Sequence, residues 1–481
     1  MKKTLMVMMT VLLLAASLFA QGAEENILEV RNTSATAPKY VFMFIGDGMS
    51  APQINAAQVY LGNNVSGQIE LGKLTFTQFP TVGIQYTQDS TSFCPDSAST
   101  ATSLSSGFKT HSGVIGVGVD KVTKGETVAE KLKSQKDWKI GVISTVTINH
   151  ATPAAYYAHV ASRNRYYDIG LQMAASGFDY FAGGSVNKAG TGDESIYSIL
   201  EKNGYTVTND RDTILSLNDK SGKVYAYSPV LQDSGSMKYA LDIKDGELTL
   251  ADFVRKGIDV LDNDNGFFMM VEGGKIDWAG HANDAAANIS DTIALDEAVQ
   301  VALDFAFQHP GETLILVTGD HETGGMTIGY AGTGYNTAFE VLSAQKCSYV
   351  EFDTMVSAER SSGTFTWERF LAMAKEYFGL GGEGALALNE YETAKLRKAY
   401  DDTLSGNTQG YEESLLYGGY SPLSVTLTHI LNNKAGIGWT SYAHTGLPVP
   451  VYAYGAGADL FSGSYDNTEV AKKLFRLLDL N

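Results

Sequence analysis

The chain has little cysteine: Cys94 and Cys347 are the only two in its 481 residues. Two cysteines are too few for a disulfide framework in a chain of this length, which argues against a disulfide-stabilised fold. One bridge between them is possible in an exported protein, and two buried free thiols are an equal alternative. The sequence leaves that choice open.

The chain is also short of positive charge. It has 35 lysines and arginines against 54 aspartates and glutamates, and its formal net charge is -19 at pH 7. Because like charges repel at long range, this balance argues against nucleic acids and anionic membrane surfaces as partners. It says little about an active site, whose local field is set by bound metals and nearby arginines.

Long hydrophobic runs are absent beyond the opening segment. That segment starts with Lys2 and Lys3, is apolar from Leu5 to Ala16 and closes on small residues, which is typical of a secretory signal peptide rather than a membrane-spanning helix. We expect residues 1–22 to be a cleaved signal peptide and the protein to be periplasmic or secreted. The remainder has no low-complexity tract and predicts a soluble globular protein. Its length alone would allow two or three domains, although large α/β enzymes often hold such a chain in one body with insertions.

Three apolar runs of strand length are present, and each leads to an acidic residue. The runs are Tyr40–Ile45, before Asp47; Phe267–Val271, before Glu272; and Thr313–Val317, before Asp320 and His321. Continuous apolar runs of this length predict parallel strands that are buried on both faces. Ligands bind outside the carboxyl ends of such strands, so we expect these side chains to form one site that holds several metal ions.

A carboxylate and an imidazole follow the second of these runs. Asp277 and His281 are four positions apart, so a helical turn would place both on one face, where they could bind one metal ion. A lone pair of this kind is more often a surface pair than a metal site. The acidic residues at the ends of the other two runs favour the metal site here.

The remaining strands and helices alternate along the chain, which predicts an α/β fold. Further strands are expected at Val82–Gln88 and Lys139–Thr145. Helices are expected at Pro52–Tyr60, Pro153–Val160, Glu194–Lys202, Leu250–Leu261 and Thr292–Phe307.

A run of small and hydroxyl residues extends from Cys94 to Thr102. Asp96 or Ser97 is most simply the N-cap of a helix, since both side chains accept hydrogen bonds from free backbone amides. A nucleophile at a helix N-terminus needs the same small neighbours and the same free N–H groups, which favour an anion. The two interpretations are compatible. Arg163 and Arg165 supply two guanidinium groups; surface arginines are the default, but an arginine near a site with several metals suits bidentate binding of a phosphoryl group.

Six short motifs together resemble the alkaline phosphatase family, over nearly the whole chain after the opening segment. They are Ile45-Gly46-Asp47-Gly48-Met49, Asp96-Ser97-Ala98-Ser99-Thr100-Ala101-Thr102, His150-Ala151-Thr152-Pro153 with Arg163, Glu272-Gly273-Gly274 with Asp277 and His281, Asp320-His321, and His444-Thr445-Gly446. Each motif alone is a weak signal, and six in the family's order make coincidence implausible. The resemblance implies a catalytic domain over residues 38–481, with a three-layer α/β/α fold and a large, mostly parallel central sheet.

The resemblance also implies an activity and a set of roles. The chain would hydrolyse small-molecule phosphate monoesters, with Ser97 as the nucleophile that becomes phosphorylated and Arg163 binding two phosphate oxygens. The cofactors would be two zinc ions and one magnesium ion. One zinc would be held by Asp277, His281 and His444, the second by Asp47, Asp320 and His321, and the magnesium by Asp47, Thr152 and Glu272. These sets suit the metals, because imidazole with carboxylate favours zinc and all-oxygen ligands favour magnesium.

Two positions depart from the best-studied bacterial members of the family. Those members have an aspartate and a lysine where this chain has His150 and Trp278, and other members also have histidine at the first position. Both residues would lie beside the magnesium and the phosphate. The identity of the third metal is therefore left open.

A long segment separates His321 from His444, and its residues 333–440 resemble an insertion of the family. The segment is rich in aromatic residues and glycine, and a helix is expected at Trp367–Phe378. A set of solvated loops is the simpler alternative, although loops this long are usually functional. The resemblance implies a crown-like subdomain that faces a second subunit, and hence a homodimer.

Related activities share the two-metal arrangement. A phosphodiesterase or a phosphoglycerate mutase-like enzyme is the alternative function, and a binding protein without turnover belongs to a different class. A sulfatase does not fit, because neither Cys94 nor Ser97 is followed by the proline and arginine of its motif. Four histidines lie outside the six motifs and are expected to be structural or at the surface: His111, His159, His309 and His429.

Overall fold

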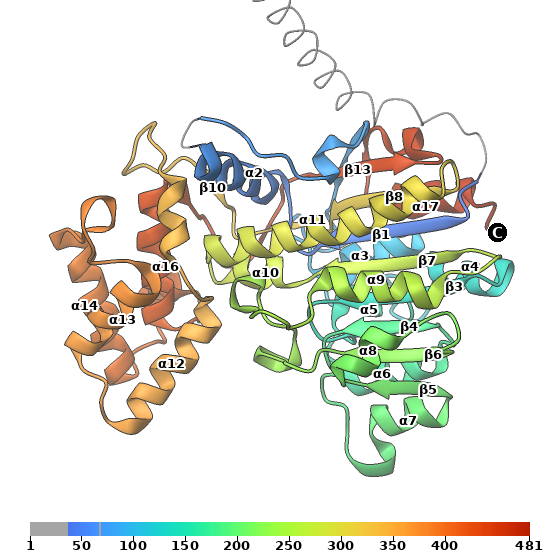
Figure 1. Ribbon diagram of the computed structural model, residues 1–481, viewed down its shortest axis with the longest axis horizontal. Coiled ribbons are helices and arrows are strands. Elements are labelled where there is room, and N and C mark those ends of the chain that lie inside the picture. Colours follow the sequence, from blue (N-terminus) through green and yellow to red (C-terminus); the bar gives the residue numbers. More distant parts are fainter. Residues whose placement is uncertain (1–36, 67–68) are drawn as a thin grey trace, which may run out of the picture.

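A computed structural model describes residues 37–66 and 69–481 (Figure 1). The predicted signal peptide, residues 1–22, lies outside the described residues. Among the helices that are described, none is both long enough and apolar enough to cross a membrane.

The fold is organised around a sheet of ten strands. In spatial order they are β14 (Gly463–Asp466), β2 (Thr81–Tyr86), β13 (Val449–Gly455), β8 (Thr313–Gly319), β1 (Tyr40–Gly46), β7 (Phe267–Gly273), β3 (Lys139–Ser144), β4 (Tyr180–Gly183), β6 (Lys223–Tyr227) and β5 (Tyr205–Thr208). All neighbouring pairs are parallel except the two that involve β13. The predicted large, mostly parallel sheet is confirmed.

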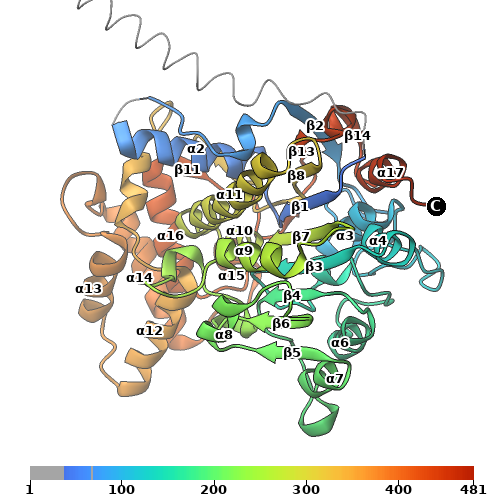
Figure 2. The same cartoon turned by 45° about the vertical axis from the view of Figure 1, so that its right-hand side comes forward.

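The strand period of two divides the apolar side chains between two cores. Along β1, Phe42 and Phe44 belong to one core, whereas Met43 and Ile45 belong to the other. The first core is covered by α2 (Ala51–Ser66), α8 (Arg211–Ser216), α9 (Leu250–Leu261) and α11 (Ala285–Gln308). The second is covered by α3 (Ser97–Ser106), α4 (Val128–Lys136), α5 (Ala151–Ala154), α6 (Tyr166–Ala175), α7 (Ile196–Lys202) and α17 (Thr468–Leu477). The three predicted layers are therefore present (Figures 1 and 2).

The register of the three central strands aligns their carboxyl ends. Gly46 at the end of β1 is paired with Gly273 of β7 on one side and Gly319 of β8 on the other. All three strands are buried along their whole length, as their apolar runs predicted. The polar residues at or just after these glycines must therefore lie side by side at one edge of the sheet.

Residues 339–435 form a group of helices, called here the helical lobe, to one side of the sheet in both ribbon views (Figures 1 and 2). It contains η5 (Phe339–Ala344), α12 (Tyr349–Ser362), α13 (Trp367–Phe378), α14 (Glu390–Ser405), α15 (Tyr411–Tyr417) and α16 (Pro422–Ala435). Its buried side chains, among them Phe352, Phe370 and Leu427, continue the first core. Solvated loops do not describe this segment, and the predicted helix at Trp367–Phe378 is confirmed.

The prediction of a helix at Pro153–Val160 is wrong. Helix α5 covers only Ala151–Ala154, and the chain then turns. Val160 is instead paired with Ile115 through two backbone hydrogen bonds of 3.0 and 2.9 Å. Tertiary pairing has overridden the local helical pattern. Other predicted elements are present with shifted ends; α11, for example, begins at Ala285 because Asp284 is its N-cap.

The two cysteines are free and differ in burial. Cys94 is exposed and Cys347 is buried, so no bridge joins them. Of the two alternatives, free thiols hold, but only Cys347 is a buried one. Burial raises the pKa of its thiol, which makes it a poor nucleophile.

Candidate functional site

The site lies at the carboxyl ends of β1, β7 and β8. Asp47 directly follows β1, Glu272 lies near the end of β7, and Asp320 and His321 directly follow β8. All four side chains are at most 1% exposed. His321 Nε2 is 3.3 Å from both Asp47 Oδ1 and Asp320 Oδ2. The parallel register thus brings together residues that are far apart in the sequence.

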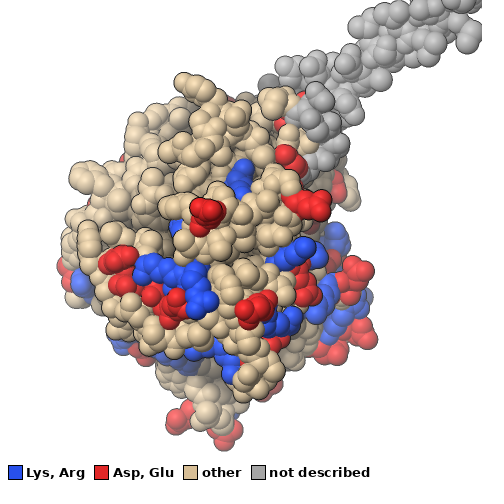
Figure 3. Space-filling model, turned by 90° about the vertical axis from the view of Figure 1, so that its left-hand side faces the viewer, with Lys and Arg blue, Asp and Glu red and all other residues tan. Residues whose placement is uncertain are grey.

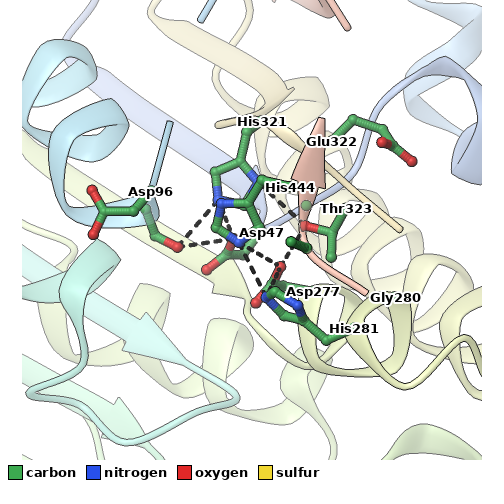
Figure 4. Close-up of polar contacts among 12 residues, drawn as sticks. Asp47, Asp96, Asp277, Gly280, His281, His321, Glu322, Thr323 and His444 are labelled. Carbon is green, nitrogen blue, oxygen red and sulfur yellow. Dashed lines mark hydrogen bonds and ion pairs between the residues drawn. The ribbon is translucent and has the colours of Figure 1, made fainter. Parts of the chain in front are cut away.

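Helix α10 (Lys275–His281) follows β7 and carries two more ligand-type side chains. His281 Nε2 is 3.4 Å from Asp277 Oδ1 on the same helix and 3.1 Å from His444 Nε2. His444 lies on β12 (His444–Thr445), which pairs with β9 (Glu322–Thr323) just after His321. Figure 4 shows the imidazoles and Asp277 pointing toward one another beside Asp47.

Three groups of side chains bring ligand atoms within 4.8 Å of one another. They are Asp277, His321 and His444; Asp47, Asp320 and His321; and Asp47, His150 and Glu272. The second group is the set expected for one zinc. In the first, His321 takes the place expected for His281, which still contacts His444. The third group contains His150, and Thr152, which is expected to bind the same metal, also lies close, with its Oγ1 3.3 Å from Asp47 Oδ2.

Ser97 is the first residue of α3, and its N-cap is Asp96, which accepts a hydrogen bond from the Ser99 amide. The capping prediction is confirmed. Ser97 Oγ lies 3.2 Å from His321 Nε2 and 3.4 Å from Asp47 Oδ1, so the hydroxyl faces the ligand groups. The free N–H groups at the start of a helix favour an anion at the same place.

Arg163 lies beside this helix start. Its Nη1 donates to Asp96 Oδ2 at 2.9 Å, and its Nη2 is 3.2 Å from His150 Nε2. A guanidinium can only donate, so Nε2 of His150 accepts and the imidazole proton is on Nδ1. Burial, and then the charge of Arg163, lowers the pKa of His150 to about 3. His150 is therefore neutral, and its Nδ1 has no hydrogen-bond partner among the described residues.

Trp278 packs between an imidazole and a buried cation. Its ring lies 5.8 Å from the His150 ring in an edge-to-face arrangement, and Lys275 Nζ is 5.0 Å from its centre. The ammonium of Lys275 is fully buried and donates to Asp233 Oδ1 at 2.5 Å. Trp278 thus forms an apolar wall on the ligand helix.

The buried carboxyl groups of the site would repel one another if all of them were ionised without bound cations. Burial raises the pKa of Glu272 to about 8 and that of Asp320 to about 6. Burial and the charge of Asp320 raise the pKa of Asp47 well above its usual value. Asp277 differs: burial opposes its ionisation, but His281 and His444 hold its pKa well below the usual range. Cations among these groups would keep them all ionised.

Comparison with known proteins identifies the group to which this site belongs. A sequence profile described as alkaline phosphatase matches residues 38–181 and 184–480. The chain belongs to the alkaline phosphatase family. Alkaline phosphatase 4 of Bacillus subtilis strain 168 is 32% identical over 492 residues, which cover 99% of this chain and 97% of that protein. Alkaline phosphatase 3 of the same strain is 31% identical over 483 residues, covering 97% and 95%.

Solved structures of alkaline phosphatases share the fold. A cold-active alkaline phosphatase from a psychrophilic Shewanella species superimposes with a TM-score of 0.76 at 29% identity, covering 91% of this chain and 99% of that one. The enzyme of the Antarctic bacterium TAB5 gives a TM-score of 0.62 at 26% identity, covering 93% and 99%. A histidine-to-aspartate variant of the TAB5 enzyme has magnesium bound in a site called M3.

Several polar residues of this alkaline phosphatase site were not predicted. Thr323 Oγ1 donates to Asp277 Oδ1 at 2.5 Å, and Thr100 Oγ1 donates to Asp320 Oδ2 at 3.0 Å. Ser144 donates to Glu272, opposite which it is paired in the sheet. Only Ser144 had a usable signal, since it is a polar residue that ends the apolar strand β3.

The four histidines outside the motifs do not join the ligand groups. His159 lies 2.8 Å from Glu130 Oε1, and His309 stacks on Phe305. His429 contacts Asn283 in the interior. None of the four belongs to a group of ligand atoms within the described residues, in agreement with the structural role expected for them.

Proposed function

We propose that this chain hydrolyses phosphate monoesters to inorganic phosphate and an alcohol through a phosphoserine on Ser97. The observation that carries this proposal is the position of Ser97 Oγ, at the start of a helix and within 3.4 Å of both Asp47 and His321. Membership of the alkaline phosphatase family supports the same activity. Ser97 and Arg163 are the residues assigned to catalysis and phosphate binding.

The side chains present fit bound divalent cations. Four carboxyl groups, those of Asp47, Glu272, Asp277 and Asp320, are buried together, and the pKa values of three of them are raised. Glu272 Oε1 is buried without a hydrogen-bond partner in the part of the chain that is described. A buried carboxylate oxygen without a partner is costly unless it binds a cation.

We assign the cations as the ligand chemistry suggests. One zinc would be held by Asp277, His281 and His444 and a second by Asp47, Asp320 and His321, since imidazole with carboxylate suits zinc. Magnesium would be held by Asp47, Thr152 and Glu272, an all-oxygen set. When bound, these metals supply Lewis acidity, which lowers the pKa of a serine hydroxyl and stabilises charge on a leaving oxygen.

The residues of the chain have separate tasks in the reaction. Ser97 Oγ gives its proton to solvent water and attacks phosphorus. A new Oγ–P bond forms, the bond from phosphorus to the alcohol oxygen breaks, and that oxygen takes a proton from water. Water then attacks the phosphoserine and the Oγ–P bond breaks; the attacking water's proton returns to Ser97 Oγ through solvent, and phosphate leaves. Arg163, oriented by its 2.9 Å bond to Asp96, holds two phosphate oxygens in both steps. Two displacements give net retention at phosphorus.

The third metal site is the least regular one. His150 lies beside Asp47 and Glu272 and is neutral, so it adds no negative charge to orient the waters around magnesium. The TAB5 variant with magnesium bound carries aspartate in place of a histidine, which motivates the same exchange at His150. We propose weak magnesium binding here, in competition with zinc.

The location and assembly of the protein are part of the proposal. The basic start and apolar run of residues 1–22 suggest export to the periplasm or the medium. Residues 333–440 would be an inserted crown within the catalytic domain of residues 38–481, and would face a second subunit in a homodimer. Light scattering on the purified protein measures the mass of the assembly directly.

One comparison of substrates tests the proposed activity. A chromogenic phosphate monoester, a diester and a sulfate ester are assayed side by side, with zinc and magnesium measured on the same sample. Turnover chiefly of the monoester with about two zincs per chain supports the proposal. Preference for the diester would make the protein a phosphodiesterase, and turnover of none of them would favour a mutase-like enzyme or a binding protein.

A further inference from the structure

Helix α10, which carries Asp277 and His281, ends in a buried corner before α11. Asn283 stands at this corner with φ of +51°, a left-handed conformation that is uncommon for a residue other than glycine. Its side chain is only 2% exposed. An isolated helix of seven residues is too short to be stable alone, so the orientation of α10 depends on the groups that hold its ends.

The amide of Asn283 links three separate segments. Its Nδ2 donates to Gly280 O at 2.8 Å, at the end of α10, and to Ser441 O at 2.9 Å. Both hydrogens of Nδ2 are then used, which fixes the orientation of the amide. Its Oδ1 lies 3.0 Å from His429 Nε2 on α16 and accepts a hydrogen bond from it.

The helical lobe adds further bonds to the same corner. Asn432 Nδ2, one turn along α16 from His429, donates to the backbone oxygen of Asn283 at 2.7 Å. Asp284 accepts from Gln345 Nε2 at 2.8 Å and from the Tyr349 amide at 2.9 Å. Side chains or amides from two parts of the lobe therefore converge on two consecutive residues.

The same corner is tied to a metal-ligand candidate. His281 Nδ1 lies 2.6 Å from Tyr442 O, one residue after the Ser441 carbonyl that Asn283 contacts. Partners of this kind fix the ring orientation of a ligating histidine. Loss of the Asn283 side-chain amide would remove its link between the end of α10 and the segment that carries Tyr442, while the backbone bond from Asn283 N to Gly280 O would remain.

We propose that Asn283 is a positioning residue through which the helical lobe orients Asp277 and His281 for metal binding. This rests on the proposed zinc role of those two residues. The alternative is that the corner is ordinary packing and contributes only to stability. If Asn283 positions the ligands, its loss lowers metal affinity by more than the loss of stability explains. If the corner is ordinary packing, only thermal stability changes.

The experiment compares four variants of the full chain. Asn283→Gly removes the amide but keeps the left-handed backbone, which glycine adopts without strain. His429→Ala removes the donor to Asn283 Oδ1, and His429→Gln restores an N–H group. Asn389→Ala is the matched control, because it removes the N-cap of α14 within the lobe, and the hydrogen bonds of Asn389 go only to Glu392 and Thr393 among the described residues.

Zinc affinity is measured by competition with a chromogenic chelator, and melting temperature is measured in parallel. We expect Asn283→Gly and His429→Ala to weaken one of the two zincs by about 10- to 100-fold. His429→Gln should recover most of the affinity, and Asn389→Ala should lower the melting temperature with wild-type zinc affinity.

Two results would overturn the inference while the proposed function stands. One is wild-type zinc affinity in both Asn283→Gly and His429→Ala, and the other is an equal loss of affinity in Asn389→Ala. If the wild-type chain itself bound no zinc, the proposed function would fail together with the inference. A variant that does not fold leaves the remaining three to decide.

Discussion

The edge of the sheet and the helical lobe are stabilised in different ways. At the edge, buried carboxyl groups lie close together and the pKa of Glu272 is raised to about 8. In the lobe, acidic side chains form ion pairs with basic ones, as in Glu359 with Arg369 and Asp402 with Lys398. Figure 3 shows both signs mixed on the side of the molecule where the lobe lies. The edge therefore depends on added cations, whereas the lobe does not.

The lobe follows the ordinary rules of helix stability. Its helices have side-chain N-caps at Ser348, Thr366 and Asn389, and α14 has a full capping box. Its interior packs aromatic rings such as Phe370 and Tyr400. Because capped helices and apolar packing stabilise the lobe, we expect its stability not to depend on bound metal, unlike the stability of the sheet edge.

Removal of the metals should have the largest effect. With a chelator, activity should be lost, and the metal-free protein should lose stability as pH rises from about 5 to about 8. The reason is that the pKa of Glu272 is about 8 in the folded state and near 4.5 when unfolded. The folded state then binds more protons in this range, so raising the pH favours unfolding. Burial raises the pKa of Asp320 to about 6, which acts in the same direction.

Melting temperatures across this pH range, with and without chelator, check the prediction. The metal-loaded protein should show much less dependence on pH, since cations keep the carboxylates ionised in the folded state. Identical pH profiles for the two forms would contradict the account of the sheet edge.

Arg163→Ala should lower kcat/KM by about 10- to 100-fold, because this is the effect expected when charge-assisted hydrogen bonds to the phosphate are lost. The loss is partial because the metals would still hold the phosphoryl group. Arg165→Ala is the matched control, because that side chain is exposed and pairs only with Asp168 among the residues described. Steady-state kinetics on a phosphate monoester decide between them, and equal effects of the two changes would contradict the assignment.

His150→Asp should have a smaller effect, on metal response rather than on the chemical step. The wild-type enzyme should be activated slowly by millimolar magnesium and inhibited by excess zinc. The added carboxylate should lower the magnesium concentration for half-activation by about tenfold and reduce zinc inhibition. Superimposable activity curves against magnesium would leave His150 a packing residue.

The smallest effect is expected in the lobe. Asn389→Ala should cost about 1 kcal/mol through loss of a helix cap. A protein of this size should then melt roughly 2 °C lower, with kcat unchanged at saturating zinc and magnesium. Calorimetry and kinetics on the same sample measure both, and a loss of kcat would mean that the lobe and the sheet edge are not separable in this way.

Much of the sheet edge could be predicted from the sequence. The runs before Asp47, Glu272 and Asp320 are long, apolar and bounded by glycine, so each predicts a buried strand and a polar end. Parallel register then requires the ends to meet. Secondary structure was harder to predict where only a local pattern was available. Val160 was predicted to be helical, but it pairs with Ile115, which is distant in the sequence.

The contacts that support the site could not be predicted. Asn283 gives no signal in the sequence, because its partners Ser441 and His429 are brought near only when the lobe folds. Thr323 is similar, since its bond to Asp277 depends on how α10 meets β9. Sequence motifs identify the residues that bind a ligand. The residues that orient these ligand-binding side chains are set by long-range packing, which the sequence does not show.

The phosphorylated residue is the most direct test of the whole account. The enzyme is incubated with inorganic phosphate at acidic pH, quenched, digested and analysed by mass spectrometry, with Ser97→Ala as the control. We expect phosphate on Ser97 alone, and neither the adduct nor appreciable turnover in the variant. Phosphate on Ser99 or Thr100, or full turnover by Ser97→Ala, would contradict the central claim.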